Sequence, residues 1–149
     1  MPAEFILRRR VQFAETDMAG VLHFSNYFRY MEEIEHAFWR SLDLTVYLRE
    51  SEPHLSWPRV ATGCEYFSPL HFEDEVDLVL RVTKVGQKSL SYEVEFRRSG
   101  ERCATGLVTA VCCVTKPGSF TPTAIPGVIR ARLNGGDSRQ VVAKDVGRL

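Results

Sequence analysis

The first pattern along the chain is an alternation of apolar and polar residues over "FILRRRVQF", residues 5–13. A period of two is typical of a β-strand with one buried face. The alternation predicts a first strand whose buried side carries Phe5, Leu7, Val11 and Phe13. The three arginines at residues 8–10 are interpreted as its solvated face.

A helical period begins at Tyr27, where apolar residues recur every three or four positions: Tyr27, Tyr30, Met31, Ile34, Phe38 and Leu42. Polar residues follow the opposite side with the same period: Arg29, Glu33, His36 and Arg40. This spacing predicts an amphipathic helix of about four to five turns with a broad apolar face. An apolar face of this width must pack against another element to be buried, and the sequence that follows predicts a sheet that could do so.

The rest of the patterned chain predicts strands joined by short turns. Apolar runs or alternations predict four more strands, at residues 57–67, 75–82, 90–96 and 102–115. One strand, one long helix and then a run of strands are typical of an α+β fold, with the helix on one face of an antiparallel sheet. We expect one domain over residues 1–133 and a flexible C-terminal tail over residues 134–149.

Composition changes this picture little, but it disfavours several classes of protein. The chain has 149 residues, 44% of them hydrophobic and 26% charged, which suits one domain with a buried core. The formal net charge is zero, so no overall field attracts nucleic acid or an anionic membrane. No apolar run approaches the roughly 18 residues of a membrane span, and the first residues do not resemble a secretory signal.

The cysteines and histidines show no spacing typical of a metal site. Cys64, Cys103, Cys112 and Cys113 lie in apolar strand patterns, which predicts buried free thiols in a reducing cytoplasm. His36, His54 and His71 are scattered along the chain. We therefore expect a cytoplasmic protein without a metal centre.

Candidate chemistry gathers just before the helix, in "ETDMAGVLHFSNY", residues 15–27. A helix start presents unpaired N–H groups and the positive end of the helix dipole, which can stabilise an oxyanion. Asp17 precedes this terminus, and Gly20 permits a close approach of backbone or ligand. Asp17 could act as a nucleophile or a general base, or it could be a loop acid that helps to end the first strand. Spacing alone leaves both interpretations open.

This segment resembles the signature of the hotdog-fold acyl-CoA thioesterases, in the group of 4-hydroxybenzoyl-CoA thioesterase-like enzymes. The matching positions are Glu15, Asp17, Gly20, Val21 and the pair Asn26 and Tyr27. The resemblance extends over roughly residues 5–126. It implies one long central helix wrapped by a five-stranded antiparallel sheet. It also implies a homodimer or homotetramer.

Carried over position by position, the resemblance implies an acyl-CoA thioesterase that needs no cofactor. Asp17 is then the nucleophile or general base, and the backbone N–H of Phe24 is the oxyanion donor. The implied substrate-binding residues are Gly20, Val21, His23, Asn26, Tyr27 and Lys88, with Lys88 toward the CoA phosphates. Glu15 is expected to be a solvated or cap-side structural acid. Whether His23 contacts the thioester or Asp17, or only packs, stays open.

Two other functions are compatible with the same pattern. A non-catalytic module that binds acyl-CoA or an acylated carrier protein would share the pocket. A hotdog hydratase or dehydratase would need a histidine with an acidic partner on the helix, for which His23 and Glu15 are poorly placed. The acyl group is not specified by these residues, because aromatic side chains along a buried helix are also ordinary core.

Overall fold

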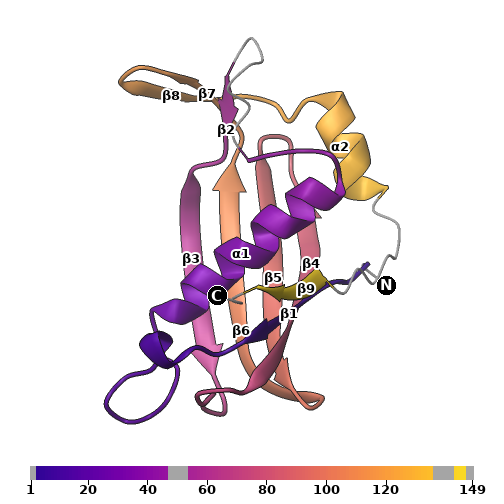
Figure 1. Cartoon of the computed structure of the whole chain (residues 1–149). Coiled ribbons are helices and arrows are strands. Elements are labelled where there is room, and N and C mark those ends of the chain that lie inside the picture. Colours follow the sequence, from indigo (N-terminus) through magenta and orange to yellow (C-terminus); the bar gives the residue numbers. More distant parts are fainter. Residues whose placement is uncertain (1–2, 47–53, 136–142, 147–149) are drawn as a thin grey trace.

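The main body of the protein is one twisted sheet with a long helix lying across it (Figure 1). The computed structural model describes residues 3–46, 54–135 and 143–146, the last four by their backbone. The strands of the larger sheet are, in spatial order, β3 (Arg59–Tyr66), β6 (Glu101–Val111), β5 (Ser89–Arg98), β4 (Glu75–Val85), β1 (Phe5–Arg10) and β9 (Ala143–Val146). All neighbours pair antiparallel except β1 and β9, which are parallel.

A second, smaller sheet lies at the end of the molecule where β3 begins (Figure 1). Its strands, in spatial order, are β2 (Leu55–Ser56), β7 (Cys113–Lys116) and β8 (Ser119–Pro122). Because β7 starts two residues after β6 ends, the two sheets are joined through Cys112. Every residue of β8 is exposed.

Helix α1 (Asn26–Ser41) covers one face of the larger sheet. Its buried residues are Tyr27, Tyr30, Met31, Ile34, Glu35 and Trp39. Helix α1 packs directly against Gly106 of β6, where an added Cβ atom would overlap the side chain of Met31. Glycine at this position therefore sets how near the helix can come to the sheet.

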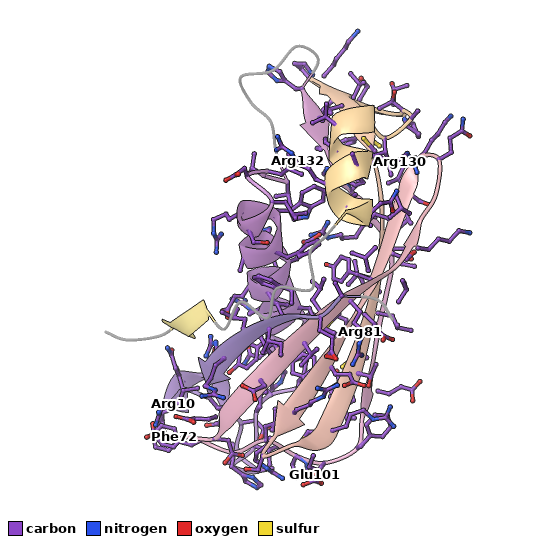
Figure 2. All side chains as sticks on the ribbon, turned by 90° about the vertical axis from the view of Figure 1, so that its right-hand side faces the viewer. Arg10, Phe72, Arg81, Glu101, Arg130 and Arg132 are labelled. Atoms are coloured by element: carbon purple, nitrogen blue, oxygen red, sulfur yellow. The ribbon has the colours of Figure 1, made fainter. Side chains whose placement is uncertain are left out.

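The short helix α2 (Gly127–Asn134) ties two distant parts of the chain together at the other end of the molecule. Its apolar side buries Ile129 and Leu133. Arg130 donates to the carbonyl oxygen of Gly86 at 2.7 Å, and Arg132 donates to the carbonyl oxygen of Leu42 at 3.1 Å. Figure 2 shows both arginines on α2, at the opposite end of the protein from Arg10.

The predicted α+β arrangement, an antiparallel sheet with a helix packed on it, is confirmed. The forecast of one helix and five strands is incomplete, because α2, β9 and the smaller sheet are also present. The first strand ends at Arg10, and a 3₁₀ helix, η1 (Phe13–Glu15), follows it. Phe13 was expected on the buried side but is 75% exposed, because this turn takes it out of the strand alternation.

Most of the predicted flexible tail, residues 134–149, lies outside the residues that the structure describes. Residues 136–142 and 147–149 lie outside the described residues, and residues 143–146 form β9 along β1. The domain boundary at residue 133 stays a prediction.

Candidate active site

Asp17 lies in a loop that the chain closes on itself between η1 and α1. We call residues 16–24 the Asp17 loop. Thr16 and Leu22 form an antiparallel bridge, and the Asp17 N–H donates to the Val21 carbonyl oxygen at 2.9 Å. At the mouth of the loop, the His23 N–H donates to the Glu15 carbonyl oxygen at 2.9 Å. These backbone bonds give Asp17 a fixed place relative to the start of the helix.

The Asp17 carboxylate uses one oxygen to shape the loop. Its Oδ1 accepts the Ala19 N–H at 2.8 Å, and the Asp17 carbonyl oxygen accepts the Gly20 N–H at 2.9 Å. Within the part of the chain that the structure describes, Oδ2 has no hydrogen-bond partner. The half-buried side chain therefore keeps one oxygen available to a substrate or a water molecule.

Gly20 is required by its backbone angle. Its φ is +79°, in the left-handed region that side chains disfavour, while a Cβ atom added there would meet nothing within 4 Å. Gly20 thus closes the turn that begins at Asp17. The close approach of a ligand to this glycine stays a prediction.

The proposed oxyanion donor lies at the end of the Asp17 loop. Among the described residues, the Phe24 N–H donates to no acceptor, while its carbonyl oxygen accepts the Tyr66 hydroxyl at 3.1 Å. Ser25 is the N-cap of α1, but its side chain makes no capping bond, and the first turn contains no acidic residue. The positive end of the helix dipole is therefore not neutralised by a carboxylate of that turn.

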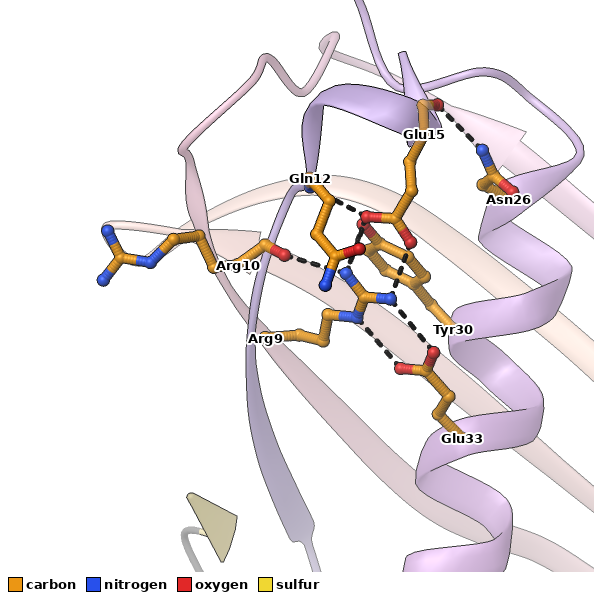
Figure 3. A network of polar contacts seen from close by, with 7 residues as sticks. All are labelled: Arg9, Arg10, Gln12, Glu15, Asn26, Tyr30 and Glu33. Atoms are coloured by element: carbon orange, nitrogen blue, oxygen red, sulfur yellow. Dashed lines mark hydrogen bonds and ion pairs between the residues drawn. The ribbon is translucent and has the colours of Figure 1, made fainter. Parts of the chain in front are cut away.

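His23 and Asn26 make local bonds around this terminus. The His23 Nδ1 lies 2.8 Å from the Ser25 hydroxyl, and the ring stacks on Phe24 with centroids 4.5 Å apart. Asn26 donates from Nδ2 to the Glu15 carbonyl oxygen at 2.8 Å (Figure 3). Asn26 therefore joins the first residue of α1 to the chain just before Asp17.

Tyr27 and Val21 lie on the inner side of the site. Tyr27 is buried, with its ring 4.8 Å from the Tyr66 ring and 5.0 Å from the Phe96 ring. Burial raises the pKa of Tyr27 to about 12 and the pKa of Tyr66 to about 12, so both phenols are neutral near pH 7. Val21 forms an antiparallel bridge with His71.

Lys88 is far from Asp17 within one subunit. It lies in the turn between β4 and β5, and its carbonyl oxygen accepts the Cys112 N–H at 2.7 Å. The Asp17 loop follows β1, whose last residue pairs with the first residue of β4. Since β4 has 11 residues, its two ends are about 35 Å apart. A contact between Lys88 and a substrate at Asp17 would therefore have to involve a long ligand or a second subunit.

Three residues important to this geometry were missed or only partly interpreted from the sequence. Arg9 was expected on a solvated face but is only 5% exposed, and it pairs with Glu15 and Glu33. Glu15 is a partly buried ion-pair partner and not a solvated acid. The cap-side structural role expected as the alternative is supported, because its Oε1 accepts the Gln12 N–H at 2.8 Å at the start of η1. Tyr66, whose hydroxyl donates to the Phe24 carbonyl, had no distinguishing sequence signal, because it is the last residue of β3 and reads as one more apolar strand residue.

A pocket of about 240 Å³ lies away from the Asp17 loop. Its lining residues are Val46, Ser56, Trp57, Pro58, Arg59 and Phe120. The charged member of this set, Arg59, pairs with Glu35, and the remainder is mostly apolar. The hydroxyl of this lining, Ser56, bonds to the Thr115 hydroxyl, and the lining contains no histidine or carboxylate that could activate it for attack on a carbonyl carbon. This pocket therefore offers a weaker candidate for the reaction centre than the Asp17 loop.

The described residues bear on three other expectations, for the cysteines, a metal site and a membrane span. All four cysteines are free thiols, with Cys103, Cys112 and Cys113 buried and Cys64 half-buried. No group of three or more metal-ligating side chains occurs among residues 3–46 and 54–135. Across the portion of the chain that the structure describes, no helix has the length and hydropathy needed to cross a membrane. The cytoplasmic location stays a prediction.

Comparison with known proteins gives consistent results. The family model described as "Thioesterase-like superfamily" matches residues 11–133. A candidate esterase of Aquifex aeolicus (strain VF5) is 34% identical over 117 residues, which cover 78% of this chain and 88% of that protein. A 1,4-dihydroxy-2-naphthoyl-CoA hydrolase of Prochlorococcus marinus (strain NATL2A) is 29% identical over 109 residues, covering 68% of this chain and 70% of that protein.

A solved structure agrees with these relatives. The structure of a gentisyl-coenzyme A thioesterase is similar with a TM-score of 0.73 and 28% identity, covering 84% of this chain and 98% of that chain. The family match alone spans more than four-fifths of the sequence. The chain therefore belongs to the thioesterase-like superfamily, which confirms the family predicted from residues 15–27 and places the protein among thioester hydrolases.

Proposed function

We propose that the protein hydrolyses acyl-CoA thioesters to a free acid and CoA at the Asp17 loop. The observation that carries this proposal is the loop itself, which ties two groups to the same helix start. Among the described residues, these are a carboxylate with one available oxygen and a backbone N–H that has no acceptor. A carboxylate beside an oxyanion donor is the minimum that acyl transfer requires.

In the proposed reaction, the thioester carbonyl oxygen accepts the Phe24 N–H, next to the positive end of α1. The negative charge that develops on this oxygen in the transition state is stabilised there. Asp17 either attacks the carbonyl carbon, giving a mixed anhydride that water then cleaves, or takes a proton from the water that attacks. In both routes the C–S bond breaks, and CoA leaves as a thiolate that takes up a proton.

We propose an aromatic acyl group as the first substrate class to test. The two named CoA-ester relatives act on 1,4-dihydroxy-2-naphthoyl-CoA and gentisyl-CoA, both of which carry hydroxylated rings. Aromatic side chains are also exposed close to the loop: Phe24 is in it, and Tyr66, which bonds to Phe24, is followed by exposed Phe67. Aromatic rings of this kind bind flat acyl groups well.

The decisive experiment measures thiol release from aromatic, short, medium and long acyl-CoA esters by the wild type and by Asp17→Asn. We expect the variant to fold and to lose at least about a hundredfold in kcat, because the amide can neither attack nor accept a proton. Equal rates in both proteins would remove Asp17 from the mechanism. A folded wild type that binds these esters without releasing thiol would instead identify the non-catalytic binding module.

The hydratase alternative receives no support from the geometry. Its acidic partner would be Glu15, but both oxygens of that carboxylate accept hydrogen bonds from Arg9 at 2.6 Å. The histidine it would need, His23, bonds to Ser25.

We also propose that a second copy of the chain covers β3, giving a homodimer or a dimer of two dimers. β3 lies at the edge of the larger sheet, and none of its eight residues is fully buried. An uncovered edge strand with exposed apolar residues such as Val60 invites uncontrolled pairing. Sedimentation at micromolar concentration should give the mass of a dimer or tetramer, and a monomer would contradict this part of the proposal.

A further inference from the structure

A buried arginine lies directly behind the Asp17 loop. Arg9 points from β1 toward α1, where its Nε and Nη2 each donate to a Glu33 oxygen at 3.0 Å (Figure 3). Its Nη1 and Nη2 also donate to the two oxygens of Glu15, each at 2.6 Å. One guanidinium therefore binds two carboxylates, each through two bonds, which is the geometry that makes arginine pairs strong and directional.

Tyr30 completes this cluster from the helix side. Its hydroxyl donates to Glu15 Oε1 at 2.7 Å and accepts from Arg9 Nη1 at 3.1 Å. The centre of the Arg9 guanidinium lies 4.1 Å from the centroid of the Tyr30 ring. Burial acts to lower the pKa of Arg9, but the hydrogen bonds to Glu33 and Glu15 outweigh it and raise the pKa, so Arg9 is a permanent cation.

Glu15 connects this cluster to the Asp17 loop through its backbone. Its side chain binds Arg9 and Tyr30, whereas its carbonyl oxygen accepts the His23 N–H at 2.9 Å and the Asn26 side-chain amide at 2.8 Å. Asp17 is two residues after Glu15, and Phe24 lies between the two residues that bind the Glu15 carbonyl. Any rotation of Glu15 would therefore move both sides of the reaction centre.

We propose that Arg9 and Glu15 are positioning residues that set the Asp17 carboxylate and the Phe24 N–H relative to each other, an inference that rests on the proposed function. Neither touches the substrate. Arg9 fixes the Glu15 side chain, and the Glu15 carbonyl fixes the chain on both sides of Phe24. Glu33, on α1, holds the opposite side of Arg9 and, among the described residues, forms no hydrogen bond with the loop. It therefore provides a matched control.

The experiment compares Glu15→Gln with Glu33→Gln, which make the same chemical change to two partners of one arginine. In Glu15→Gln we expect kcat to fall roughly 10- to 100-fold with KM changed by less than about threefold, because a misplaced carboxylate acts on the transition state more than on binding. In Glu33→Gln we expect kcat to stay within about threefold of the wild type, because Glu15 still holds Arg9.

Backbone amide NMR shifts of residues 16–24 report the position of the loop without any substrate. They should change in Glu15→Gln and keep their wild-type values in Glu33→Gln. If kcat and these shifts change equally in both variants, the cluster is only a structural ion network and the positioning role is overturned. An unchanged kcat in a folded Glu15→Gln overturns it as well.

Failure of the proposed function can be distinguished from failure of this inference. If the wild type releases no thiol from any ester, the activity is wrong, and the amide shifts still decide whether Glu15 positions the loop. If Glu15→Gln does not fold, Glu15→Asp and Glu33→Asp replace the pair in both measurements. These substitutions keep the carboxylate charge and shorten each side chain by one methylene group.

Discussion

Two glutamates of helix α1, Glu33 and Glu35, pair with arginines from different strands. They differ in burial and in how many of their hydrogen bonds are formed. Both oxygens of Glu33 accept bonds from Arg9 of β1, and its side chain is 30% exposed. Glu35 is 1% exposed and pairs through Oε1 with Arg59 of β3, while within the described residues its Oε2 has no partner. The same type of ion pair is thus fully satisfied near the Asp17 loop and only partly satisfied further along the helix.

The difference shows that the contribution of an ion pair to stability depends on how buried it is and on whether its hydrogen bonds are complete. Glu33 keeps contact with solvent and completes its bonds, so its charge costs little. Burial raises the pKa of Glu35 despite the opposing effect of Arg59, which means that the folded environment disfavours its charge. A buried charged group with an unsatisfied hydrogen-bonding atom contributes little to stability. A network in which every hydrogen bond is formed can hold the neighbouring groups in a fixed position.

The largest effect should come from removing the cation of the satisfied cluster. Arg9→Met leaves Glu15 and Glu33 facing each other with no charge between them, which typically costs about 3–5 kcal/mol of unfolding free energy. Urea unfolding of the full chain measures this loss. The control is Arg8→Met, whose pair with Asp77 is 49% and 36% exposed and should contribute no more than about 1 kcal/mol. Equal losses in the two variants would show that the Arg9 cluster behaves as surface charge.

The smallest effect should come from neutralising the other glutamate, and its sign should depend on pH. The pKa of Glu35 is raised above its ordinary value of 4.5, so the folded protein holds this proton more tightly than the unfolded chain. The wild type therefore loses stability as pH rises from 4.5 through the folded pKa, and Glu35→Gln does not. We expect the variant to gain up to about 1 kcal/mol relative to the wild type near neutral pH, and less at pH 4.5, because glutamine matches the protonated carboxyl. Unlike the Glu15 and Glu33 pair in Arg9→Met, the partner left behind, Arg59, keeps contact with solvent, with its side chain 31% exposed.

Unfolding measured at several pH values checks this prediction. A difference between Glu35→Gln and the wild type that stays constant with pH would contradict the direction of the Glu35 shift. A large loss of stability at every pH would show that Arg59 needs the Glu35 carboxylate. Glu35 would then stabilise the fold through its arginine, as Glu33 is expected to do.

The long strands and α1 could be predicted because their burial repeats with a period that the sequence displays. β4 and β5 bury nearly alternate residues, and α1 differs from its expected bounds by about one residue at each end. β8 has no buried residue and α2 buries only two, so neither leaves a periodic signal. β9 pairs with β1 through its backbone, which no side-chain pattern reports.

The candidate site was predictable only in part. Asp17 and Phe24 came from resemblance, because one carboxylate and one backbone N–H are too common to identify by spacing. Arg9 had a signal that was misinterpreted: the alternation that buries Leu7 and Val11 also puts Arg9 on the inner face. A charge at an inward position requires partners, but Glu33 and Tyr30 lie more than twenty residues away, and only the folded chain brings them together.

The pairing of β1 with β4 also determines when the site can exist. Arg10 bonds to Glu75, 65 positions later in the sequence. Chains are synthesised at about 5–20 residues per second, so Asp17 and its loop leave the ribosome several seconds before the strand that fixes β1. During that interval Arg9 has no sheet to hold it in place. Assembly of the reaction centre is therefore among the later steps of folding, and a chain interrupted before β4 would contain every proposed catalytic atom without the framework that aligns them.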